Sequence, residues 1–160
     1  MNFNDLSFHR QGGWRSQFYR LQRWHTRVKF LGAGVSPDEQ DVFYAFFQNC
    51  FTLKDWLKNS GAAGAADLNA FVDSYKEISA CRDLANGTKH YNVTAASIDP
   101  GFFICREYVS PDSPTARSGS NSRPILCAGG IQWDLFDLVD RCMELWIEFL
   151  TSRHLLSDNR

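Results

Sequence analysis

The feature that most constrains the fold is a complete helix-start signature followed by a wide apolar stripe. Ser36, Pro37 and Glu39 supply an N-cap residue, a proline at the first helical position and the third-position acid of a capping box. Apolar residues then recur at helical spacing as far as Leu57, and Ser60-Gly61 follows as a stop signal. The segment therefore predicts a long amphipathic helix that buries one face.

Three further segments show helical periodicity. The patterns predict helices over about 14–31, 67–90 and 131–155. Between the last two, residues 102–109 and 124–128 are β-branched and aromatic, and a Ser-, Pro- and Gly-rich stretch joins them, so we expect a hairpin with a mobile loop over about 92–129. The predicted fold class is mainly α: an antiparallel four-helix bundle with a small inserted β hairpin, in a single domain over 1–160.

Composition excludes some classes of function but does not identify one. The chain has 160 residues and a formal net charge of −1, so overall charge indicates no ligand. No apolar run is long enough to span a membrane and no signal peptide precedes the first helix, so we expect a cytoplasmic protein with no membrane association. The five cysteines are scattered and never form a CxxC pair, and the histidines are isolated, so the spacing predicts neither a metal site nor a disulfide framework, and we expect no cofactor.

Polar side chains interrupt the predicted helix 67–90 where its apolar face continues. Carrying the helical phase forward places Arg82, Asn86 and His90 on that face, with Asp83 at its edge. Two interpretations stay open. The residues form a structural polar network, or they form a site in which His90 transfers protons, Arg82 stabilises negative charge, and Asp83 and Asn86 support them. The second arrangement, without a metal, suits cleavage of RNA through its own 2′-hydroxyl.

These residues resemble the motif of the HEPN superfamily. That motif has an arginine followed by a polar residue, then a histidine after four to six intervening residues; here seven residues separate Arg82 from His90. HEPN proteins are helical bundles, often dimers, and many are RNases of toxin–antitoxin, CRISPR and phage-defence systems. The resemblance implies a metal-independent endoribonuclease in which Arg82 and His90 are catalytic and Asp83 and Asn86 support them.

The first predicted helix and its flanks carry a second hint of RNA binding. No acidic residue lies between Leu6 and Pro37. Basic residues in this stretch alternate with aromatic ones, a pattern typical of nucleic-acid surfaces. Together with Lys89, the candidate nucleic-acid-binding residues are Arg10, Arg15, Arg20, Arg23 and Arg27. A competing hypothesis is that Arg20, Arg23 and Arg27 pack against the acidic stripe of the last helix, at Asp137, Asp140 and Glu144.

The last predicted helix is apolar around more than half of its circumference. Phe136, Met143 and Ile147 lie away from its main stripe, and we expect one small bundle to leave them uncovered. This predicts a homodimer or a protein complex. A non-enzymatic helical module that binds a protein, and a nucleic-acid-binding accessory subunit, are the alternatives to the RNase.

Overall fold

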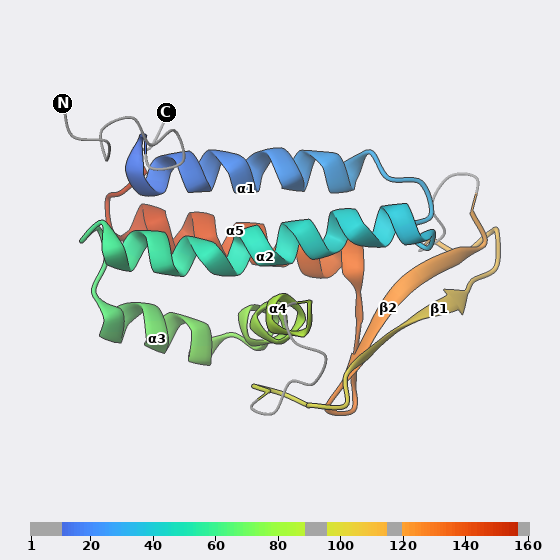
Figure 1. Cartoon of the computed structure of the whole chain (residues 1–160). Coiled ribbons are helices and arrows are strands. Elements are labelled where there is room, and N and C mark those ends of the chain that lie inside the picture. Colours follow the sequence, from blue (N-terminus) through green and yellow to red (C-terminus); the bar gives the residue numbers. More distant parts are fainter. Residues whose placement is uncertain (1–10, 89–95, 115–119, 157–160) are drawn as a thin grey trace.

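The chain folds into helices packed beside a small sheet. The structure is a computed structural model that describes residues 11–88, 96–114 and 120–156. In this part of the chain it is mainly helical, with one three-stranded antiparallel sheet (Figure 1). The helices are α1 Gly13–Lys29, α2 Pro37–Asn59, α3 Ala65–Ser74, α4 Lys76–Gly87 and α5 Leu135–Ser152, and the strands are β1 Phe103–Tyr108, β2 Ser122–Ala128 and β3 Ile131–Asp134.

The start of α2 follows the predicted capping box. The Ser36 hydroxyl accepts the Glu39 backbone N–H at 3.3 Å. The Glu39 carboxylate in turn accepts the backbone N–H of Ser36 at 3.1 Å. Two backbone N–H groups that would lack a partner at the helix start are thus hydrogen-bonded. The prediction of this helix is confirmed, and the helix ends at Asn59.

The single helix expected over 67–90 is two helices. Tyr75 has extended backbone angles (φ −121°, ψ 119°) and separates α3 from α4. Figure 1 shows α1, α2, α3 and α5 lengthwise, whereas α4 is seen almost end-on and so crosses them. The antiparallel four-helix bundle is therefore not confirmed. The break also resets the helical phase on which the predicted Arg82–Asn86–His90 face depended.

The expected hairpin is part of a larger sheet. Strand β2 pairs antiparallel with β1 and, on its other side, with β3. Gly129 and Gly130 connect β2 to β3 with φ of +56° and +75°, the left-handed pair that a tight hairpin turn requires.

The last helix accordingly begins later than predicted. Residues 131–134 form β3 instead of helix. The Asp134 carboxylate then caps α5 by accepting the backbone N–H of Phe136 at 2.8 Å. The helix ends at Ser152, short of the predicted Leu155.

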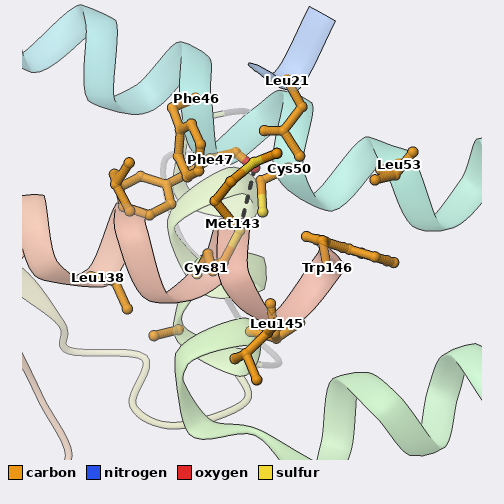
Figure 2. Packing of buried hydrophobic residues seen from close by; sticks show 14 of the residues in the cluster. Leu21, Phe46, Phe47, Cys50, Leu53, Cys81, Leu138, Met143, Leu145 and Trp146 are labelled. Carbon is orange, nitrogen blue, oxygen red and sulfur yellow. Dashed lines mark hydrogen bonds between the residues drawn. The ribbon is translucent and has the colours of Figure 1, made fainter. Parts of the chain in front are cut away.

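One apolar core lies among α1, α2, α3, α4 and α5, and Figure 2 shows part of it from close by. Phe43, Phe46 and Phe47 of α2 and Trp146 of α5 are fully buried there. Phe136 and Met143 are buried too, at 7% and 4% exposed. The expectation that a single chain would leave them uncovered was wrong, because both belong to the chain's own core. The Phe136 ring packs edge-on against the Phe43 ring, with the ring centres 5.0 Å apart.

The length and composition of the helices also bear on membrane crossing. None of those in the described residues combines the length and apolar character that a bilayer span requires.

Candidate functional site

Asp83 is the buried centre of the polar group predicted on α4. Its side chain is on the core side of the helix, and the residue is 3% exposed. One carboxylate oxygen accepts the Ser97 backbone N–H at 2.6 Å, and the other accepts the Ile98 backbone N–H at 2.9 Å. The phase prediction, which placed Asp83 at the edge, was wrong because the helix breaks at Tyr75. Asp83 joins α4 to the segment that leads into β1.

Arg82 contacts the same segment from the side. Its Nε donates to the Ser97 hydroxyl, and its Nη1 lies 3.5 Å from the Asp73 carboxylate of α3. Its side chain is 29% exposed and that of Asp73 is 67% exposed. Asn86 is half-buried one turn further along α4. These bonds connect α3, α4 and the segment before β1, as a structural polar network does.

His90 and Lys89 lie outside the described residues. The helix that carries Arg82 ends at Gly87. The position of the proposed catalytic histidine relative to Arg82 therefore stays a prediction. What the structure does bring together is Arg82 and Asp83, and it places both on Ser97.

The arginines of α1 do not pack against the acidic stripe of α5. Asp140 is instead bonded by His25 Nε2 at 2.6 Å and Lys29 Nζ at 3.4 Å. Among the described residues, none of the four α1 arginines forms an ion pair. The packing hypothesis was wrong because His25 and Lys29 are the basic residues that reach α5. Arg10 lies outside the described residues.

The α1 arginines lie against aromatic rings instead. The guanidinium carbon of Arg27 is 4.3 Å from the centre of the Trp24 ring, and that of Arg15 is 4.6 Å from Trp14. Arg20 lies 5.9 Å from the Trp56 ring and donates to the Gln17 side chain at 2.8 Å. These are cation–π distances.

Four residues of α1 form one exposed row, which we call the α1 basic row. They recur every fourth position and so follow one side of the helix. Tyr19, within the row, is 53% exposed. The row consists of Arg15, Tyr19, Arg23 and Arg27.

A cavity of about 400 Å³ opens between one end of the row and α5. Ile147, 40% exposed, is on its wall. Of the three α5 residues expected to be uncovered, Ile147 alone stays exposed, and the prediction of self-association now depends on it. The lining residues are Arg15, Phe18, Tyr19, Gln22, Ile147, Leu155 and Leu156.

Sequence spacing missed a cluster of thiols. Cys50 of α2, Cys81 of α4 and Cys142 of α5 are fully buried, and their sulfur atoms all lie within 4.8 Å of one another. Figure 2 shows two of them, Cys50 and Cys81. The spacing rule failed because the three come from different helices, far apart in the chain. The remaining pair, Cys105 and Cys127, lies on the sheet with sulfurs 3.8 Å apart.

Comparison with known proteins found no relative: no protein-family model, no curated protein and no solved structure matches this chain.

Proposed function

We propose that this protein binds single-stranded RNA through the α1 basic row and the neighbouring Arg20. The observation that carries the proposal is the absence of carboxylate contacts to any of the four α1 arginines among the described residues. An arginine whose positive charge is not used inside the protein is available to a phosphate.

The aromatic contacts support the same proposal. A guanidinium that rests on a tryptophan face loses some of its freedom but keeps its N–H donors at the edge of the plane. Arg27 on Trp24 has this arrangement, and so does Arg15 on Trp14, although one Arg15 N–H already donates to the Leu155 carbonyl at 3.4 Å. Their N–H groups are thus partly ordered before a ligand arrives, which lowers the entropy lost on binding.

Tyr19 indicates a single strand in preference to a duplex. Its exposed ring lies between arginines of the row, where an unpaired base could stack on it. Bases in a duplex are already stacked on each other and offer no free face. The row offers arginines for phosphate contacts and a ring for base stacking, but no set of side chains that would hydrogen-bond the edges of particular bases. We therefore expect weak sequence preference.

The test is fluorescence anisotropy of a labelled oligouridine at several salt concentrations. We expect Arg23→Ala/Arg27→Ala to weaken binding and to reduce the steepness of log K against log salt by about 1.4, or about 0.7 for each lost phosphate contact. The matched control is Lys58→Ala/Lys76→Ala, which removes the same charge from exposed positions on α2 and α4. Equal loss in both double variants would show that only net charge matters, and the proposal would fail.

The second candidate is a HEPN-like RNase at Arg82, Asp83, Asn86 and His90. It is favoured by the guanidinium of Arg82, whose ion pair with Asp73 is near the surface and therefore weak enough for a phosphate to displace. Cleavage of the same oligonucleotide by the wild type, lost in His90→Ala with an unchanged melting temperature, would support it. If the wild type does not cleave RNA and His90→Ala lowers the melting temperature, the structural polar network is supported. If the wild type neither cleaves nor binds RNA, the protein-interaction module is supported.

A further inference from the structure

The three buried cysteines of α2, α4 and α5 meet without any other metal-ligating side chain. The candidate cluster holds Cys50, Cys81 and Cys142 alone, so no histidine or carboxylate of the described residues completes it. Two of the thiols donate to main-chain carbonyls: Cys81 to Phe47 and Cys142 to Glu77, each at 3.5 Å. The sulfur of Cys50 is left facing its two neighbours.

A buried donor lies beside this cluster. The indole N–H of Trp146 is fully buried and has no hydrogen-bond partner of ordinary geometry among the described residues. The indole N–H acts on the nearby Cys50 thiol in the direction that lowers its pKa. An unpaired polar group in a core normally has a reason, since leaving it unbonded costs about 1–3 kcal/mol.

The three thiols differ in acidity. Burial raises the pKa of Cys50, but contacts with Cys142, Cys81 and Trp146 outweigh burial and lower the pKa below its ordinary value. Burial raises the pKa of Cys81 and Cys142 well above that value. Whatever their acidity, the three sulfurs all lie within 4.8 Å of one another, and this geometry defines a common site.

We propose that Cys50, Cys81 and Cys142 form a three-coordinate sulfur site for a trivalent thiophilic metalloid, with arsenite as its simplest ligand. In each of three steps one arsenic–sulfur bond forms and one arsenic–oxygen bond breaks, and the thiol proton leaves with the departing hydroxyl as water. Arsenite and three thiols thus give an arsenic trithiolate and three waters, with no electron transferred.

Charge selects this class of ion over the common metals. Three thiolates around a trivalent centre have no net charge, and an apolar core tolerates a neutral group best. The same thiolates would leave one negative charge around Zn²⁺ and two around Cu⁺. Zn²⁺ also requires a fourth ligand in a closed site, which the described residues do not supply.

The geometry requires little movement. Trivalent arsenic carries a lone pair, so its three sulfurs form a pyramid; with bonds of about 2.3 Å, the length of a zinc–thiolate bond, they lie about 3.5 Å apart. The three sulfurs of the protein lie within 4.8 Å of one another, so binding calls for a contraction of at most about 1.3 Å. Full burial means that entry requires a local opening of the helices, so we expect slow association.

The test uses the reduced Cys105→Ser/Cys127→Ser variant, which removes the sheet thiols as a competing site. After incubation with arsenite we expect one arsenic per chain, seen as a mass gain of one arsenic less three hydrogens. The melting temperature should rise. The fine structure of the arsenic X-ray absorption edge should show three sulfur neighbours. Adding Cys81→Ala should abolish binding, whereas the parent double variant should keep it.

Four results would overturn the proposal. They are an unchanged mass, binding only in denaturant, an absorption edge with fewer than three sulfurs, and a rise in melting temperature with Zn²⁺ as large as that with arsenite. If Cys81→Ala does not fold, the absorption edge of the folded double variant decides by itself.

Discussion

The Asp83 carboxylate accepts the backbone N–H of Ser97 at 2.6 Å, across fourteen residues of chain. A buried carboxylate bonded to two backbone amides holds α4 and the approach to β1 together. Asp83 thus has a structural role within the polar group predicted on α4.

Asp83→Ala should lower the free energy of unfolding by about 2–3 kcal/mol, because two charge-assisted bonds disappear and their amides lose their acceptors. Asp73→Ala is the control, since it breaks only the exposed pair with Arg82 and should cost less than about 1 kcal/mol. Urea unfolding followed by circular dichroism measures both. Equal stabilities of the two variants would contradict the structural role.

Gly34→Ala should destabilise the protein by about 2–5 kcal/mol. Gly34 has φ +72°, and an added Cβ would lie 2.9 Å from the Phe136 ring and 3.0 Å from the Phe43 ring. Gly61→Ala is the matched control: its φ is +71°, but nothing lies within 4 Å of the added carbon. It should therefore cost about 1–2 kcal/mol from backbone strain alone. Thermal unfolding of the two variants separates the cost of backbone strain from the cost of the added carbon's contacts. If Gly61→Ala loses as much stability as Gly34→Ala, close packing at Gly34 is contradicted.

Glu39→Gln should lose stability at neutral pH and little at low pH. Partial burial raises the pKa of Glu39, but hydrogen bonds from Ser36, Gly34 and Gly32 outweigh it, so the pKa in the folded protein is lowered. A lowered folded pKa stabilises the protein above the unfolded value of about 4.3, and the stabilisation is lost as pH falls through the folded pKa. Unfolding curves of both proteins from pH 7 to pH 3 should converge at the acid end. A constant gap would contradict this account.

Ile147 decides the prediction of self-association. If a homodimer forms through α5 beside the α1 cavity, Ile147→Glu should shift the mass from light scattering at micromolar concentration from dimer to monomer. Phe103→Glu, which changes an exposed aromatic of the sheet, should leave the mass unchanged. A monomeric wild type would end the dimer hypothesis, and with it a site shared between two chains.

The helices with their own boundary signals were predictable from sequence. The capping box of Ser36 and Glu39 is local, so the residues themselves determine where α2 begins. The break at Tyr75 has no such signal, because no glycine or proline marks it and the apolar spacing continues through it. Extending the helical phase past that break placed Asp83 on the wrong side.

Residues of the site that depend on tertiary contacts were less predictable. That His25 and Lys29, not the arginines, reach Asp140 follows from how α1 is rotated against α5, which periodicity alone does not define. The Cys50, Cys81 and Cys142 cluster depends on three helices meeting at one point. Periodicity grouped Arg20, Arg23 and Arg27 on one side of the first helix, whereas Arg20 contacts Gln17 and Trp56 and lies outside the exposed α1 basic row.

The most direct test of RNA binding through α1 is photo-cross-linking to an oligonucleotide that contains 4-thiouridine, followed by mass spectrometry of the peptides. We predict that the main cross-link lies in α1, at or beside the exposed ring of Tyr19, and that it disappears in Arg23→Ala/Arg27→Ala. A main cross-link near Arg82 and Ser97, with α1 unmodified, would contradict the account and favour the site at the end of α4.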